Sequence, residues 1–235
     1  MISLRKAFDA VLSALYPDRC AVCGEVIESG KRLCESCKDE VFPIFGDICH
    51  NCGVGLDCHD KTRCRSFEAP VIAAYYYRGA VRNLIIDFKD TRSVKAFGVF
   101  SPSFFERIAR EYSDIDFDIT VCVPSEGKKK GTSRIISEET AKRFLLGFDK
   151  DVLEKYRHTE KQHRLKTRER FHNLENSIRV REGKEAFVKD KTVLLCDDVK
   201  TTGSTLSECA KALYKAGAKK VYCACIAVSD YGTLK

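Results

Sequence analysis

The strongest constraint on the fold is the run from Val193 to Thr205, where an apolar strand leads into two acidic residues and then a hydroxyl-rich loop. Asp197 and Asp198 carry only hydrogen-bond acceptors when ionised, so the pair can bind two neighbouring hydroxyls of a sugar. The loop precedes an expected helix, and the backbone N–H groups of a helix N-terminus favour phosphate. The loop residues are Thr201, Thr202, Gly203, Ser204 and Thr205. This order predicts a site for a phosphorylated ribose at the end of a strand.

Other phosphate-binding patterns do not fit this run. The Gly-Lys-Ser/Thr triplet that closes a Walker A loop is missing, and so is the GxGxxG pattern of dinucleotide-binding folds. The alternative is a buried strand of an α/β protein that ends in two acidic residues without a ligand. With the Thr-Thr-Gly-Ser-Thr loop attached, the run resembles the phosphoribosyl pyrophosphate (PRPP) motif of type I phosphoribosyltransferases along its whole length.

Alternating apolar strands and amphipathic helices predict the fold around this run. Strands are expected at 69–77, 119–123, 152–156, 192–196 and 220–228, and helices at 80–89, 94–111, 133–146 and 204–216. This alternation is typical of an α/β fold, in which a mostly parallel sheet carries helices on both faces. We place this domain, expected to be type I phosphoribosyltransferase-like, at residues 69–235.

Residues 1–68 are expected to form a small cysteine-rich, zinc-binding domain. Eight of the 13 cysteines lie before residue 65, and six of these eight form Cys-x2-Cys pairs. Two such pairs can hold one zinc ion in a closed tetrahedral site, so the segment predicts one or two structural zinc ions. The expected ligands are Cys20, Cys23, Cys34, Cys37, Cys49, Cys52, Cys58 and Cys64. Metal would then supply much of the folding free energy of this segment.

The grouping of these ligands is open on sequence alone. A sequential arrangement, which we prefer for its shorter loops, joins the first four cysteines in one site and the last four in the other. An interleaved arrangement pairs the first two cysteines with Cys49 and Cys52. His50 and His59 can each replace a thiolate at the second site, although exposed loop histidines are the simpler interpretation. Before the cysteines, apolar residues at helical spacing predict a helix that packs on the rest of the protein.

A cationic loop is expected next to the aspartate strand. The stretch from Lys128 to Gly131 follows the strand at 119–123, and the carboxyl ends of parallel strands meet at one side of a sheet. We expect Lys130 and Gly131, together with Lys89, to face a pyrophosphate. A solvated run of charges is the alternative for this stretch.

A second cationic stretch runs from Lys155 to Asn173 and contains few apolar residues. It is expected to be an exposed, mobile loop. Such a loop can close over a bound polyphosphate, or it can lie along a nucleic-acid backbone. An ordinary basic loop is the third interpretation.

Charge and hydrophobicity indicate the cellular location that we expect for this protein. The net charge of +7 suits phosphate-bearing ligands or nucleic acid, but it is also common in other soluble proteins. Neither a signal peptide nor an apolar stretch of about 20 residues is visible, so we expect no membrane span. A cytoplasmic location is therefore expected, where disulfides are rare and metal is the first explanation for many cysteines.

The layout as a whole resembles the ComF family, bacterial competence-associated proteins with a phosphoribosyltransferase-like domain. The resemblance is carried by Leu15-Tyr16-Pro17-x2-Cys20-x2-Cys23-Gly24, by Arg78-Gly79 followed by Phe88-Lys89, by Gln162-x2-Leu165-x2-Arg168-x-Arg170-x2-Asn173, and by the PRPP motif. One block departs: where family members usually have Arg-Gly-Phe-Asn-Gln, this chain has Lys130-Gly131-Thr132-Ser133-Arg134.

The resemblance implies PRPP binding and a link to DNA uptake. As an enzyme, the protein would bind PRPP with Mg²⁺ and transfer ribosyl 5-phosphate to a nitrogen acceptor, with Asp197, Asp198 and Arg168 as catalytic residues. The cysteine-rich segment or the helix before it would cap the acceptor pocket. The alternative is an accessory module that binds single-stranded DNA and keeps a regulatory or vestigial PRPP pocket. The sequence indicates neither the acceptor nor the oligomeric state.

Overall fold

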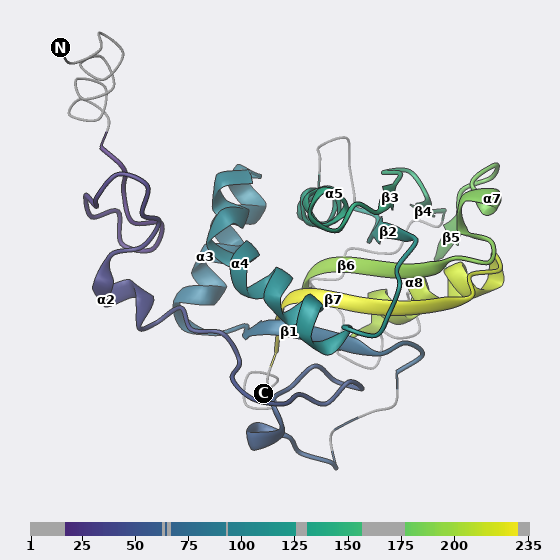
Figure 1. Ribbon diagram of the computed structural model, residues 1–235, viewed down its shortest axis with the longest axis horizontal. Helices are drawn as coiled ribbons and strands as arrows, with labels where there is room; N and C mark the ends of the chain where they lie inside the picture. The colour runs from purple at the N-terminus through teal and green to yellow at the C-terminus, as the bar shows by residue number, and fades with distance from the viewer. Residues whose placement is uncertain are drawn as a thin grey trace, which may run out of the picture.

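A five-stranded parallel sheet forms the centre of the fold (Figure 1). The computed structural model describes residues 17–62, 64, 67–92, 94–125, 131–156 and 177–229, without the side chains of 94–96. In spatial order the strands are β1 (Val71–Tyr76), β7 (Lys220–Val228), β6 (Thr192–Lys200), β2 (Ile119–Cys122) and β3 (Gly147–Phe148). Every neighbouring pair is parallel, which confirms the predicted sheet. The helix expected before the cysteines lies outside the described residues.

Helices cover both faces of this sheet, as predicted. One face carries α3 (Gly79–Thr91), α4 (Val94–Glu111) and α5 (Thr132–Phe144), and the other carries α8 (Ser204–Lys215) (Figure 1). Among the described residues, no helix combines the length and the apolar character needed to cross a membrane.

The alternation of side chains along the strands explains these two layers. Successive residues of a strand point to opposite faces of the sheet. Leu194 on β6 belongs to the same buried apolar cluster as Phe88 of α3 and Ile135 of α5. Its neighbour Leu195 belongs to a second cluster, which it shares with Leu206 of α8. Because the strands are apolar on both faces, the sheet requires helices on both sides.

A small antiparallel hairpin stands apart from the main sheet. It consists of β4 (Leu153–Lys155) and β5 (Ile178–Val180), and α7 (Glu185–Val188) follows it. The strand expected at 152–156 is thus confirmed in position. The basic stretch of the sequence lies between the two strands of this hairpin.

The first cysteine ribbon is attached to α4. It contains a bridge between Arg19 and Val26 and the short helix α2 (Glu35–Lys38). The Arg32 guanidinium lies on Gly98 of α4, where a Cβ would come within 1.6 Å of Arg32 Nη1. A glycine in the middle of this helix therefore makes room for the arginine.

The second cysteine ribbon, residues 41–64 with the 3-10 helix η1 (Leu56–Cys58), packs along β1. Ile44 N–H donates to the Ala74 carbonyl at 2.8 Å, and Val71 N–H donates to the His50 carbonyl at 2.7 Å. Apolar residues of this ribbon are buried in the cluster that α3 and α4 share with the sheet. The expected division after residue 68 therefore crosses one continuous apolar core.

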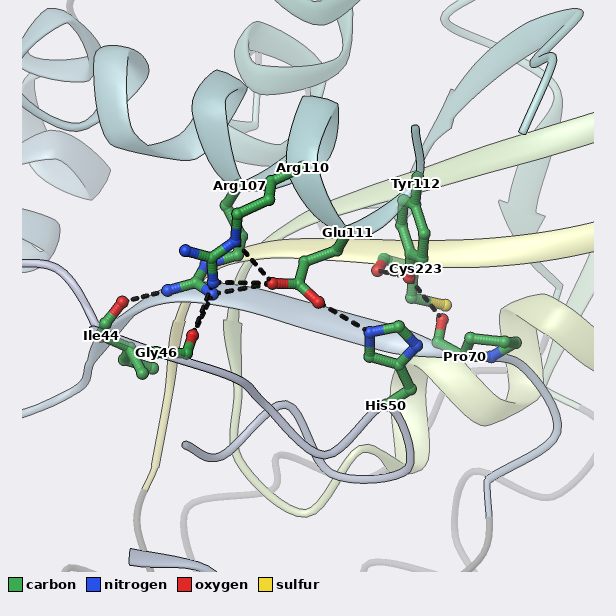
Figure 2. Close-up of polar contacts among 9 residues, drawn as sticks. All are labelled: Ile44, Gly46, His50, Pro70, Arg107, Arg110, Glu111, Tyr112 and Cys223. Atoms are coloured by element: carbon green, nitrogen blue, oxygen red, sulfur yellow. Dashed lines mark hydrogen bonds and ion pairs between the residues drawn. The ribbon is translucent and has the colours of Figure 1, made fainter. Parts of the chain in front are cut away.

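A buried arginine on α4 holds the backbone of the second ribbon (Figure 2). Arg107 is 5% exposed, and it donates hydrogen bonds to the Ile44 carbonyl and, at 3.0 Å, to the Gly46 carbonyl. Glu111 accepts a further bond from Arg107 at 2.9 Å and lies 3.0 Å from His50 Nε2. Burial acts to raise the pKa of Glu111, but the hydrogen bonds from His50 and the arginines outweigh it and lower the pKa.

Candidate functional site

The predicted ribose site lies where β2 ends beside β6. The two strands pair in parallel with Cys196 opposite Cys122, so the residues that follow them meet at one side of the sheet, as predicted. β6 does not end at Cys196, however, because it continues through both aspartates to Lys200, which pairs with Val228 on β7. Asp and Lys disfavour strands, which made this stretch look like a loop, but pairing with β7 overrides that preference.

Three side chains contact the aspartate pair. Ser133 Oγ donates to Asp197 Oδ1 at 2.6 Å, and Thr132 Oγ1 donates to Asp198 Oδ2. Lys89 Nζ lies 2.9 Å from Asp198 Oδ1. Both carboxylates therefore already accept hydroxyl donors, which is the type of bond that a ribose diol would make.

Thr132 and Ser133 were not predicted as site residues. Gly131, which was predicted, is the residue before α5, and the two hydroxyl residues form the first turn of this helix. Their signal in the sequence is their position, directly after the expected pyrophosphate loop and where the chain departs from the family pattern. Lys130, the other predicted residue of this loop, lies outside the described residues.

The charges of this site are coupled. Burial, and then the charge of Asp198, raise the pKa of Asp197 to about 7. Burial acts to lower the pKa of Lys89, but the charge and hydrogen bond of Asp198, together with the charge of Asp197, outweigh it and raise the pKa. Lys89, which was expected to face the pyrophosphate, thus forms an ion pair with one carboxylate. The site holds two carboxyl groups and one ammonium group, and it can lose a proton near neutral pH.

The loop between β6 and α8 has the geometry of an anion site. Gly203 adopts φ +83°, which favours glycine, and directly precedes the first residue of α8. Thr202 Oγ1 lies 2.8 Å from Ser204 Oγ, so the hydroxyls gather around the turn. Thr201 and Thr205 complete the predicted loop and are exposed and half-buried, respectively. The N-terminus of a helix with such donors favours phosphate.

Arg168 and most of the basic stretch lie outside the described residues. The structure does describe the base of this stretch, where Tyr156 N–H donates to the Ser177 carbonyl at 3.1 Å. The guanidinium of Arg179 lies over the Tyr156 ring, 5.1 Å from the ring centroid. The role of Arg168 remains a prediction from the sequence.

The first cysteine cluster has the geometry of a zinc site. The sulfur atoms of Cys20, Cys23, Cys34 and Cys37 all lie within 4.8 Å of one another. Two thiolates on one tetrahedral zinc lie about 3.8 Å apart, and Cys23 Sγ lies 3.8 Å from Cys34 Sγ. Burial acts to raise the pKa of Cys20, but backbone hydrogen bonds outweigh it and lower the pKa to about 6. The pKa of Cys37 is instead raised, chiefly by its hydrogen bond with Cys34, because the four thiols share one site and the first to ionise holds protons on the others.

The second cluster contains a histidine that was expected to be an ordinary loop residue. Ligand atoms of Cys49, Cys52, His59 and Cys64 lie within 4.8 Å of one another, and Cys49 Sγ lies 3.7 Å from Cys64 Sγ. Cys58, the predicted fourth ligand, is exposed and outside this group. The 3-10 turn of η1 places the following residue, His59, toward the other three. The geometry favours sequential grouping with one imidazole in the second site.

Matches to known families follow these two parts of the chain. Residues 11–67 match the double zinc ribbon domain, and residues 106–233 match the phosphoribosyl transferase domain. The second match covers more than half of the 235 residues. The chain belongs to the phosphoribosyl transferase domain family. The double zinc ribbon supports structural zinc at the two clusters, and the combination of both domains is consistent with the ComF family.

Curated relatives align with different shares of this chain. DNA utilization protein YhgH of Salmonella typhi is 26% identical over 219 residues, which are 88% of this chain and 89% of that protein. DNA utilization protein YhgH of Escherichia coli K12 is 38% identical over 80 residues, 33% and 34% of the two chains. A solved structure of the allosteric regulatory enzyme of purine biosynthesis aligns with 50% of this chain and 23% of its own, at 20% identity and a TM-score of 0.34.

Proposed function

We propose that this protein binds PRPP and transfers its ribosyl 5-phosphate group to a nitrogen acceptor, in a cytoplasmic process linked to DNA utilization. The observation that supports this most is the aspartate pair beside a phosphate-type loop, at the carboxyl ends of β6 and β2. The family match and the names of the relatives support the reaction class and the biological setting, respectively.

In this proposal the ribose hydroxyls donate to Asp197 and Asp198 and replace the bonds from Ser133 and Thr132. The 5′-phosphate binds the N–H groups and hydroxyls at residues 201–205. The bond between C1′ and the pyrophosphate oxygen breaks as the acceptor nitrogen bonds to C1′, and the acceptor then loses its proton. Lys130 faces the departing pyrophosphate, and Arg168 closes over it from the basic stretch.

Mg²⁺ is expected to accompany the substrate. It prefers oxygen ligands and commonly binds one or two carboxylates together with substrate phosphates, and the oxygens of Asp197 and Asp198 fit that donor set. When bound, the ion would neutralise charge on the leaving pyrophosphate. The charge of the aspartate pair decides how well it holds both the ion and the sugar, so binding should improve as Asp197 loses its proton near pH 7.

Calorimetric titration of PRPP into the zinc-loaded protein tests this proposal. We expect Mg²⁺-dependent binding that is lost in the Asp197→Asn/Asp198→Asn variant. The matched control is Asp114→Asn/Asp116→Asn, which changes two exposed aspartates in the connection before β2 and leaves binding intact. Equal affinity in the site variant and the wild type would exclude this site. A screen of nitrogen bases for pyrophosphate release would then identify the acceptor.

A second candidate is binding of single-stranded DNA, favoured by the names of the relatives and by the basic stretch between β4 and β5. Contacts to a phosphate backbone weaken steeply with salt. Fluorescence anisotropy with a labelled oligonucleotide should therefore show salt-dependent binding that is lost when Lys161, Arg164 and Lys166 are changed to glutamate. Failure to bind at low salt would exclude this candidate.

A further inference from the structure

The chain between the second cysteine cluster and β1 lies against the phosphate loop. A Cβ placed on Gly203 would meet Cε2 of Phe67 at 3.1 Å and Cδ2 of the same ring at 3.6 Å. The Phe67 ring therefore packs on the α-carbon of the glycine that forms the turn. Lys200 packs beside it, with its Cε 3.2 Å from the same position. Two side chains therefore pack against the turn: Phe67, from the chain before β1, and Lys200, from β6.

The next residue, Glu68, binds the helix that follows the loop. Its carboxylate accepts a hydrogen bond from Ser207 Oγ, and its other oxygen lies 3.5 Å from Lys211 Nζ. Both partners lie in the first two turns of α8, directly after the loop. Burial acts to raise the pKa of Glu68, but the bond from Ser207 and the charge of Lys211 outweigh it and lower the pKa. The loop and the start of α8 are therefore held by the same two neighbouring residues.

This segment is short and is fixed at both ends. Cys64, a member of the second cluster, precedes Phe67 by three residues, which span at most about 10 Å. On the other side, Ala69 is 1% exposed and Val71 begins β1. Two residues separate Cys64 from Phe67, so the position of Cys64 limits where Phe67 can lie.

The second cluster is the one that lies next to Phe67 in the chain, because its member Cys64 is three residues away. The first cluster is attached elsewhere, through Arg32 on α4. Of the two clusters, the second is therefore the one joined to Phe67 by a short length of chain.

We propose that Phe67 and Glu68 are positioning residues that hold the phosphate loop at 201–205 in its anion-binding form, and that metal at the second cluster sets this contact. The part of this inference that concerns affinity for PRPP rests on the proposed function. The part that concerns the order of residues 201–205 is independent of it. A loop ordered before the ligand arrives loses less conformational freedom on binding, which strengthens binding.

Hydrogen exchange of the full-length, zinc-loaded protein tests the statement about the loop. We expect the amides of residues 201–207 to exchange about tenfold faster in Phe67→Ala than in the wild type. The amides of β6, which precedes the loop, and of β7 should keep wild-type rates. Phe67→Leu should restore most of the protection. The matched control is Phe42→Ala, which removes a 48% exposed aromatic ring from the ribbon and should leave the loop unchanged. Wild-type exchange of the loop in Phe67→Ala would overturn the proposal.

Glu68→Gln keeps the test valid if Phe67→Ala does not fold, because Glu68 has a partly exposed side chain. This variant should raise loop exchange less than Phe67→Ala does, and wild-type loop exchange in Glu68→Gln would overturn the proposal where Phe67→Ala does not fold. For the metal, His59→Ala should speed exchange of the loop, whereas Cys23→Ser at the first cluster should not. Equal effects of these two variants would contradict the specific role of the second cluster. Zinc content, measured by mass spectrometry, verifies which ion each variant has lost.

Titration with PRPP separates the two proposals. If the inference holds, Phe67→Ala binds PRPP about tenfold more weakly than the wild type. Wild-type protein that binds no PRPP, together with faster loop exchange in Phe67→Ala, refutes the proposed function and supports the positioning of the loop. Wild-type PRPP affinity and wild-type exchange in Phe67→Ala refute the positioning and leave the proposed function standing.

Discussion

Replacing Arg107 by alanine should destabilise the protein far more than the same change at Arg110. Both arginines donate to the Gly46 carbonyl and to Glu111 (Figure 2). They differ in burial, since the Arg107 side chain is 5% exposed and that of Arg110 is 51% exposed. Only Arg107 also bonds the Ile44 carbonyl. The two substitutions therefore compare a buried and an exposed arginine that both bond Gly46 and Glu111.

The magnitude follows from what each change leaves behind. Without Arg107, the Ile44 carbonyl loses its side-chain donor, at a cost of about 1–3 kcal/mol for a buried polar group. Glu111 keeps Arg110 and His50, so we add only about 1–2 kcal/mol for the lost charged bond. The free energy of unfolding should thus fall by about 2–5 kcal/mol. For Arg110→Ala we expect a loss below about 1 kcal/mol, because exposed ion pairs contribute little.

Urea denaturation of the zinc-loaded proteins, followed by circular dichroism at fixed zinc concentration, measures both values. Zinc content must be equal in the two variants, because loss of an ion would add its own destabilisation. Equal losses for the two variants, or a loss below about 1 kcal/mol for Arg107→Ala, would refute the reasoning from burial.

Three further predictions concern the metal, the aspartate pair and the core. His59→Ala should retain one zinc ion per chain and Cys58→Ser should retain two, as mass spectrometry can show; the reverse result would restore Cys58 as the ligand. Because the pKa of Asp197 is raised to about 7, the folded state binds this proton more tightly than the unfolded chain, so the free energy of unfolding should fall between about pH 4 and pH 7 and then level off. Asp197→Asn should remove this pH dependence of the free energy of unfolding, as urea titrations at several pH values can measure. An unchanged pH dependence would show that other groups cause it. Tyr112→Phe should cost about 1–2 kcal/mol, because the single hydroxyl hydrogen lies between the carbonyls of Pro70 and Cys223, whose oxygens are 3.1 and 3.0 Å from the hydroxyl oxygen; a neutral change in thermal unfolding would contradict this.

Much of the fold could be predicted from local sequence patterns. The strand at 220–228 and the helix at 94–111 agree with β7 and α4 at both ends, because apolar periodicity in each is strong. The end of β6 could not be predicted, since its last four residues are held by pairing with β7 rather than by their own propensity. The short strands β3 and β5 have two and three residues, too few for a periodic signal.

The candidate site was predicted in part for a similar reason. Asp197 and Asp198 could be recognised because their chemistry and their loop are contiguous in the sequence. The contacts of Thr132 and Ser133 with that pair join residues more than 60 positions apart, and no local pattern encodes them. Whether His59 or Cys58 lies with the other three ligands depends on how the 3-10 helix η1 orients these two residues, and the spacing of the cysteines does not determine that.

The hydrogen bonds of Ile44 and His50 with β1 have a consequence for the behaviour of the protein in solution. β1 is the outermost strand of the sheet, and an outermost strand with bare N–H and C=O groups is a template for pairing with another molecule. The ribbon occupies those groups, and its own shape depends on metal. A chain deprived of zinc is expected to uncover β1 and to release the ribbon with its stacked rings of Phe42 and Phe45. We therefore expect zinc supply to protect this protein against aggregation through strand pairing, in addition to any part it has in ligand binding.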